Sequence, residues 1–196
     1  MLVRDLMTPD PVTVTGEVSV KEALARLARL GITSMPVVDG HRRLCGIVSE
    51  ADLIRDLVAR DPRAQERPVE VEPLFPPHSV EEVYTRSAAS VRIDDDVASA
   101  VETMTALSAK SLPVVDTRGR LVGVLSRSDV VQALARADEV IAADIDEVLA
   151  SLGHEDWLVE VDDGVVSVSG PSGPADHSLA HVVARTVPGV VEVRVD

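Results

Sequence analysis

The stretch Met35-Pro-Val-Val-Asp39, followed by Gly46-Ile-Val-Ser-Glu-Ala-Asp52, decides the fold because it occurs twice in the chain. Its second copy is Leu112-Pro-Val-Val-Asp116, followed by Gly123-Val-Leu-Ser-Arg-Ser-Asp129. Each residue of the first copy has its counterpart 77 positions later, and no insertion interrupts this register. The two copies must therefore be interpreted as repeats of one structural unit.

Each repeat orders its apolar segments in the same way. A short apolar strand precedes an amphipathic helix, two strands joined by a tight turn, and a second helix. Ser19 and Glu22 form the pattern of a capping box at the first helix, Gly31 follows that helix, and Asp96 caps its counterpart. The stripes expected to face the core are Val20, Ala23, Leu24, Leu27 and Leu30, then Val97, Ala100, Val101, Met104 and Leu107. The sequence predicts an α/β (α+β) fold with two β-α-β-β-α repeats.

Two hairpin turns and one long connection divide the chain. Asp39–Arg43 and its counterpart Asp116–Gly119 join apolar runs, and both turns carry arginines. Residues 59–79 lose all periodicity and gather five prolines, which predicts an irregular linker. We expect the repeats at 1–58 and 80–137 and a different domain at 138–196.

The last segment does not continue the repeat. An apolar helical stripe is followed by two Val-rich strands around Asp162-Asp-Gly164, a second helix through Leu179–Ala184, and a last strand, Val191–Val195. The stripe consists of Val140, Ile141, Ile145, Val148, Leu149 and Leu152 and ends at Gly153. The predicted order is α-β-β-α-β.

The paired Pro-Val-Val-Asp and Gly-hydrophobic-hydrophobic-Ser-x-x-Asp motifs resemble those of tandem cystathionine-beta-synthase (CBS) domains, over about residues 1–137. The resemblance implies two repeats packed about a pseudo-twofold axis, with two clefts that bind adenosine-containing ligands. It also implies a homodimer.

Residues 138–196 resemble the BON domain of bacterial osmotic-stress and nodulation proteins, through Asp163–Gly170 and Val187-Pro-Gly-Val190. That family is thought to attach to phospholipid surfaces. This segment, however, carries 13 acidic residues against Arg185 and Arg194, a net charge of −11, whereas residues 1–137 carry −3. An anionic membrane surface should repel it, so we expect no membrane binding and instead a basic protein partner or an intramolecular packing role.

The composition excludes several classes of protein. A net charge of −14 and a single Trp, Tyr and Phe leave neither the cations nor the aromatic surface for binding nucleic acid. Cys45 cannot form an intrachain disulfide and is expected to be a small core residue of a buried strand. No apolar run resembles a signal peptide or a membrane span, which predicts a cytoplasmic protein.

The candidate ligand-binding residues follow from the family's pattern. Ser49 and Ser126 begin helices whose free N–H groups can hold a phosphate, and Asp52 and Asp129 can accept hydrogen bonds from ribose hydroxyls. Adenine would lie against Thr13, Val14, Thr33, Met35 and Pro36 in the first copy and Ser90, Val91, Lys110, Leu112 and Pro113 in the second. The alternative is that both Ser-x-x-Asp motifs are only capping boxes and that the apolar positions are ordinary core.

The two clefts differ in charge. Glu50 follows Ser49, whereas Arg127 follows Ser126 and Lys110 replaces Thr33. A carboxylate repels phosphate and a guanidinium can bind it through two hydrogen bonds, so phosphate-bearing nucleotides should prefer the second cleft.

No catalytic or metal site is expected. His177 and His181 are one helical turn apart but lack a third ligand, and no nucleophile with its base is recognisable. The sequence thus predicts a regulatory protein that needs no cofactor, is not an enzyme, and binds an adenine nucleotide or S-adenosylmethionine as a regulatory ligand. The alternatives are a stress-related scaffold with empty clefts and a peripheral membrane adaptor acting through the BON-like domain.

Overall fold

The computed structural model describes residues 1–55, 57 and 76–196, so most of the predicted linker lies outside the described residues. The elements of the first repeat are α1 (Val3–Leu6), β1 (Thr8–Pro9), α2 (Val20–Leu30), β2 (Ser34–Val38), β3 (Leu44–Ser49) and α3 (Glu50–Ile54). Those of the second are the 3-10 helix η2 (Val80–Glu82), β4 (Thr85–Arg86), β5 (Val91–Arg92), α4 (Val97–Ala106), β6 (Ser111–Val115), β7 (Leu121–Ser126) and α5 (Arg127–Leu134). The mixed α/β class is confirmed, and the short elements α1, β1, η2 and β4 were not predicted.

The chain forms two compact units, and neither unit is a single repeat. Unit 1 consists of Met1–Thr8, Ile93–Lys110 and Leu125–Asp196, and unit 2 consists of Pro9–Arg92 and Ser111–Val124. Each unit therefore contains segments of both repeats. The strands form sheets of order β2-β3-β4, β1-β7-β6-β5 and β10-β9-β8.

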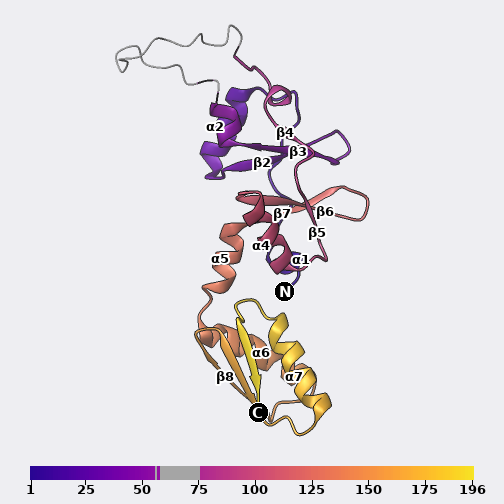
Figure 1. The fold of residues 1–196 in the computed structure, drawn as a ribbon, viewed down its shortest axis with the longest axis vertical. Helices are drawn as coiled ribbons and strands as arrows, with labels where there is room; N and C mark the ends of the chain where they lie inside the picture. Colours follow the sequence, from indigo (N-terminus) through magenta and orange to yellow (C-terminus); the bar gives the residue numbers. More distant parts are fainter. Residues whose placement is uncertain (56, 58–75) are drawn as a thin grey trace, which may run out of the picture. The chain divides into compact units, whose positions relative to one another are not determined.

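Unit 2 holds the hairpins of both repeats. β2 and β3 pair in antiparallel fashion, and the predicted first strand is reduced to a parallel bridge between Val14 and Val37. In the second repeat this strand is β5, which pairs in parallel with β6. Helix α2 lies beside β2 and β3 (Figure 1) and its apolar face completes a core with the strands. That core consists of Val14, Val20, Ala23, Leu27, Met35, Val37, Val48, Leu53 and Val80.

The two hairpins meet at residues that are repeat equivalents of each other. The hydroxyl oxygens of Ser34 and Ser111 are 2.8 Å apart, and Arg43 forms an antiparallel bridge with Arg120. Both pairs are separated by the repeat interval of 77 positions. Contacts between equivalent residues are expected where a pseudo-twofold axis passes, so this part of unit 2 follows the predicted symmetry.

The segment that begins each repeat packs with the other repeat. In unit 1 the Val3 amide donates to the Asp95 carbonyl at 2.8 Å. In unit 2 the Val80 amide donates to the Val18 carbonyl at 2.9 Å. The two bonds are equivalent under the repeat interval, and both Val3 and Val80 are fully buried. The two repeats have therefore exchanged their first elements.

The motif glycine of the first repeat accommodates this exchange. β4 belongs to the second repeat but pairs with β3 of the first, with Gly46 opposite Arg86. A Cβ atom on Gly46 would lie 2.1 Å from the Thr85 carbonyl oxygen and 2.7 Å from the Tyr84 ring. Only glycine permits so close an approach of the two backbones.

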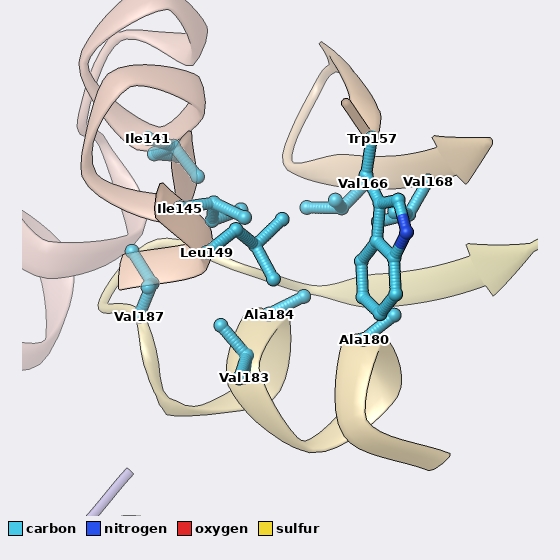
Figure 2. Packing of buried hydrophobic residues seen from close by; sticks show 10 residues of the cluster. All are labelled: Ile141, Ile145, Leu149, Trp157, Val166, Val168, Ala180, Val183, Ala184 and Val187. Atoms are coloured by element: carbon cyan, nitrogen blue, oxygen red, sulfur yellow. The ribbon is translucent and has the colours of Figure 1, made fainter. Parts of the chain in front are cut away.

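Residues 138–196 have the predicted α-β-β-α-β order. The elements are α6 (Asp138–Ser151), β8 (Leu158–Asp162), β9 (Val165–Ser169), α7 (Pro174–Thr186) and β10 (Glu192–Val195). Figure 2 shows its core, in which Trp157 lies between the strands and α7. The buried residues are Ile141, Ile145, Leu149, Trp157, Val166, Val168, Ala180, Val183, Ala184 and Val187.

Several predicted core positions are exposed instead. Leu30 and its equivalent Leu107 are 43% and 58% exposed, because each lies at the end of its helix, beyond the last turn that packs on a sheet. Val101 of α4 is also exposed. In α6, Val140, Val148 and Leu152 are exposed, because the buried face that packs on β8 and α7 consists of Ile141, Ile145 and Leu149. Met104 is buried, as predicted.

Cys45 is half-buried rather than buried. Burial, and then the charges of Asp39 and Glu81, raise the pKa of its thiol. A raised pKa keeps the thiol protonated at neutral pH and therefore a poor nucleophile, which agrees with a packing role.

Candidate functional site

The start of α3 carries the first predicted ligand-binding pair. The Asp52 carboxylate accepts hydrogen bonds from the Ser49 amide at 2.9 Å and from the Ser49 hydroxyl at 2.7 Å, both at Oδ2. The Asp52 amide in turn donates to the Ser49 hydroxyl at 3.3 Å. This reciprocal arrangement is a complete capping box.

The start of α5 repeats this geometry. Asp129 Oδ2 accepts from the Ser126 amide at 2.7 Å and from the Ser126 hydroxyl at 2.8 Å, and the Asp129 amide donates back at 3.2 Å. Both motifs therefore form capping boxes. Because both bonds use the same carboxylate oxygen, Oδ1 of each aspartate is left for other partners.

The two Oδ1 atoms differ in their surroundings. Asp52 Oδ1 lies 3.6 Å from the Arg55 guanidinium. Within the described ranges, no cation lies within salt-bridge distance of Asp129. Asp129 thus presents an uncompensated carboxylate oxygen at the helix start, which suits the ribose-binding role predicted for it.

A backbone hydrogen bond joins the segment before each Pro-containing strand to the helix start. The Glu50 amide donates to the Thr33 carbonyl at 2.9 Å, and the Arg127 amide donates to the Lys110 carbonyl at the same distance. The fold therefore brings Thr33 beside the first capping box and Lys110 beside the second. The side chains of Thr33 and Lys110 are exposed.

The apolar site residues are mostly buried in the core. Val14, Met35 and Pro36 are buried in unit 2, as are their equivalents Val91, Leu112 and Pro113, whereas Thr13 is half-buried and Ser90 is exposed. The residues of the first copy all fall in unit 2. Those of the second copy are divided, with Ser90, Val91, Leu112 and Pro113 in unit 2 and Lys110, Ser126, Arg127 and Asp129 in unit 1.

Arg127 has a structural partner that the sequence did not indicate. One of its guanidinium nitrogens donates to the Met104 carbonyl at 3.1 Å, near the end of α4. A cation at a helix C-terminus is favourable because it opposes the negative end of the helix dipole. The remaining N–H groups of the guanidinium could still bind a phosphate.

The sequence profile of the CBS domain matches residues 3–59 and 80–136. This protein belongs to the CBS domain family. The two matches start and end 77 positions apart, so the family model matches both repeats in the same register.

Solved CBS pairs resemble this one over both repeats. The CBS domain pair of protein MJ0100, in complex with 5′-methylthioadenosine and S-adenosyl-L-methionine, is 27% identical, with a TM-score of 0.55 and coverage of 67% of this chain and 94% of that chain. CBSX2 in complex with AMP is 29% identical, with a TM-score of 0.54 and the same coverage. CBSX2 is a CBS-pair protein of Arabidopsis thaliana.

Longer curated proteins also match this chain. The magnesium transporter MgtE of Thermus thermophilus is 33% identical over 171 residues, which cover 85% of this chain and 32% of the transporter. This chain spans between 14% and 32% of the length of such longer curated relatives, some of which bear the names of enzymes.

Outside the CBS clefts, the described residues also bear on metal binding and on membrane spanning. Among the described residues, no group of three or more His, Cys, Asp or Glu side chains is arranged to hold a metal ion, and His177 and His181 stand alone on α7. None of the described helices is long and apolar enough to cross a membrane.

Arg136 is a functional candidate that the sequence analysis missed. It is the last residue of the second CBS match and lies just after α5. Its guanidinium donates to the Pro188 carbonyl at 2.9 Å and pairs with Asp144 at 2.5 Å. Arg136 therefore ties the end of α5 to the domain formed by residues 138–196. A basic residue at a predicted helix end was the only available signal.

Proposed function

We propose that this protein is a non-enzymatic regulatory module that binds adenosine-containing ligands of the AMP, ADP and ATP class in the clefts of its CBS pair and signals to a partner. S-adenosylmethionine is the second ligand class in this proposal. The proposal also includes a cytoplasmic location and the boundaries given above for the repeats, the linker and the C-terminal domain.

The repetition of one hydrogen-bonded arrangement carries this proposal. Both Ser-x-x-Asp motifs form the same capping box, and in both a backbone bond holds an exposed polar residue, Thr33 or Lys110, beside it. A capping box needs no such neighbour, and other residues cap helices equally well. Two relatives at 27% and 29% identity have been solved with adenosyl ligands, which supports adenosine as the common chemical group.

We assign phosphate-bearing nucleotides to the second cleft. Asp129 offers an uncompensated Oδ1 for ribose hydroxyls, and Arg127 and Lys110 supply cations near the helix start. In the first cleft, Asp52 already interacts with Arg55, and Glu50 would repel a phosphate. That cleft should take uncharged adenosyl groups or remain empty.

Calorimetry on a matched pair of variants tests this assignment. Asp129→Ala and Asp52→Ala remove equivalent capping boxes, so each should lower the free energy of unfolding by a similar amount, about 1 kcal/mol. Only Asp129→Ala should weaken AMP binding, by about 1.5–3 kcal/mol, the scale of hydrogen bonds to a charged group. A dominant loss of AMP binding at Asp52→Ala would show that the first cleft is the nucleotide site.

A third variant separates the phosphate from the nucleoside. Arg127→Gln keeps an N–H group for the Met104 carbonyl but removes the charge. It should weaken AMP binding and leave adenosine binding unchanged, because only AMP carries the phosphate. If no adenosine compound raises the melting temperature of the wild-type chain, the protein is a scaffold with empty clefts.

We further propose that residues 138–196 are a BON-like domain that passes the signal on. The contacts of Arg136 with Pro188 and Asp144 support this role, because α5 begins at the second capping box and ends at this contact. With a net charge of −11, the domain should bind a basic protein partner rather than lipid. Flotation with anionic liposomes at physiological salt would instead establish a membrane adaptor.

A homodimer is the last part of the proposal. The same positions of both repeats leave apolar side chains exposed, namely Leu30 and Leu107, Ile54 and Val131, and Leu57 and Leu134. Each of these residues is at least 39% exposed, and covering such faces is a common reason for dimerisation. Light scattering at micromolar concentration tests it, and a monomer would contradict it.

A further inference from the structure

The paired hairpin turns of unit 2 bring arginines together. The Leu121 amide donates to the Arg42 carbonyl at 3.0 Å, and the Leu44 amide donates to the Gly119 carbonyl at 3.4 Å. These bonds flank Arg43 and Arg120, which lie directly opposite each other as a non-hydrogen-bonded antiparallel pair. In such a pair both side chains project from the same face at close separation.

Two like charges in this arrangement repel each other. Arg43 and Arg120 are exposed, as are Arg42 and Arg118 of the same two turns. Like charges directly opposite across a strand pair destabilise it. Within the described part of the chain, neither Arg43, Arg118 nor Arg120 has a carboxylate within salt-bridge distance.

The nearest acidic groups neutralise this cluster only in part. Asp39 accepts hydrogen bonds from the His41 and Arg43 amides, and Asp116 accepts them from the Arg118 and Arg120 amides. Each carboxylate thereby shapes its turn, and each also attracts the charged side chains beside it, Arg43 for Asp39 and Arg118 and Arg120 for Asp116. A third carboxylate, that of Asp10, lies 3.2 Å from the Arg42 guanidinium in an exposed ion pair, so these three carboxylates face four arginines.

Arg42 occupies a backbone conformation that favours glycine. Its φ is +60°, and its repeat equivalent is Gly119, with a φ of +74°. The second repeat thus meets the same requirement with glycine, whereas the first retains a residue for which this conformation is unfavourable. An exposed ion pair with Asp10 contributes too little to explain that choice.

We propose that the arginines of the two paired turns form a binding site for a free multivalent phosphate anion, located on the pseudo-twofold axis. Guanidinium groups bind phosphate through pairs of hydrogen bonds, and several negative charges on one small ligand would relieve the repulsion between Arg43 and Arg120. β3 begins at Leu44 and reaches the first capping box at Ser49, so five residues of extended strand separate Arg43 from that box. The site is therefore distinct from the first adenosine cleft.

Titration of the full chain with inorganic triphosphate at low ionic strength tests this proposal. We expect saturable binding that weakens as salt is added. Arg43→Gln and Arg120→Gln should each weaken it about threefold, and the double variant about tenfold, the scale of exposed ion pairs. Arg29→Gln is the matched control, because Arg29 is an exposed arginine of the same unit at the end of α2, and it should change the affinity less than about twofold.

The double variant should fold at least as well as the wild type, because it removes a like-charge pair. Its melting temperature without ligand should be unchanged or higher. Equal triphosphate affinity in the double variant and the wild type would overturn the proposal, as would an equal loss in Arg29→Gln. Binding to vesicles of phosphatidylglycerol and phosphatidylcholine without binding to triphosphate would assign the arginines to a lipid surface instead. Retention of triphosphate binding in Asp129→Ala would keep this site independent of the adenosine cleft.

Discussion

Replacing Gly46 with alanine should disrupt the pairing of β3 with β4. The added Cβ would lie 2.1 Å from the Thr85 carbonyl oxygen and 2.7 Å from the Tyr84 ring. A backbone oxygen cannot turn aside as a flexible side chain can, so β4 itself must move. The residue that would be displaced belongs to the second repeat, although the substitution is in the first.

The size of the effect follows from the contacts that β4 makes. Two residue pairs join β4 to β3, and the Ser87 amide donates to the Cys45 carbonyl at 3.2 Å just beyond them. Overpacking a well-filled site costs about 1–3 kcal/mol, and each backbone hydrogen bond lost costs about 1 kcal/mol more. We therefore expect the free energy of unfolding to fall by about 2–4 kcal/mol.

Urea denaturation followed by far-ultraviolet circular dichroism measures this loss. Gly40→Ala is the matched control, because a Cβ at that position of the β2–β3 turn meets no atom within 4 Å. It should change the unfolding free energy by less than about 0.5 kcal/mol. If Gly46→Ala unfolds at the same urea concentration as Gly40→Ala, the exchanged strand does not constrain this glycine and the argument is wrong.

Three further changes have defined outcomes. Ser108→Gly should raise the free energy of unfolding by about 0.5–1 kcal/mol, because Ser108 has a φ of +52° at the end of α4, where α2 ends with Gly31. Differential scanning calorimetry measures it. Val3→Ala should lower that free energy by about 2 kcal/mol, since Val3 is fully buried, and urea denaturation would show a smaller loss if the exchanged segment is dispensable. Hydrogen bonds from the Arg43 and Arg120 amides lower the pKa values of Asp39 and Asp116. The stability that Asp39 and Asp116 contribute is present above the ordinary carboxyl pKa of about 3.9. It is lost as the pH falls through their lower pKa values in the folded protein. The urea midpoint of an Asp39→Asn/Asp116→Asn variant should therefore fall less than that of the wild type when the pH is lowered from about 5 to about 3. These two pH values lie about one unit above and below the ordinary carboxyl pKa.

Local signals in the sequence were sufficient to predict the main helices, caps and hairpins of the two repeats. Local turn and capping motifs predicted both hairpins, the capping residues Ser19 and Asp96, and the helix end at Gly31, all of which are present. These features depend on a few neighbouring residues, so sequence alone can specify them. The capping boxes at Ser49 and Ser126 were foreseen for the same reason.

Features that depend on distant parts of the chain were not foreseen. The exchange of Val3 and Val80 between repeats leaves no local pattern, because each segment would be apolar in either location. Arg127 and Arg136 each donate to a carbonyl group, 23 and 52 positions away, and a carbonyl has no sequence signature. The exposure of Leu30 and Leu107 likewise reflects where the helices end relative to their sheets.

The exchange of first elements has a consequence for synthesis on the ribosome. Asp95, the hydrogen-bond partner of Val3, is made 92 residues after Val3. At a synthesis rate of about 5–20 residues per second, the apolar segment around Val3 waits roughly ten seconds without its partner. Val80, by contrast, emerges after Val18 and can dock at once. Unit 2 can thus begin to assemble during translation, while the segment around Val3 stays available to chaperones until Asp95 of the second repeat has been made.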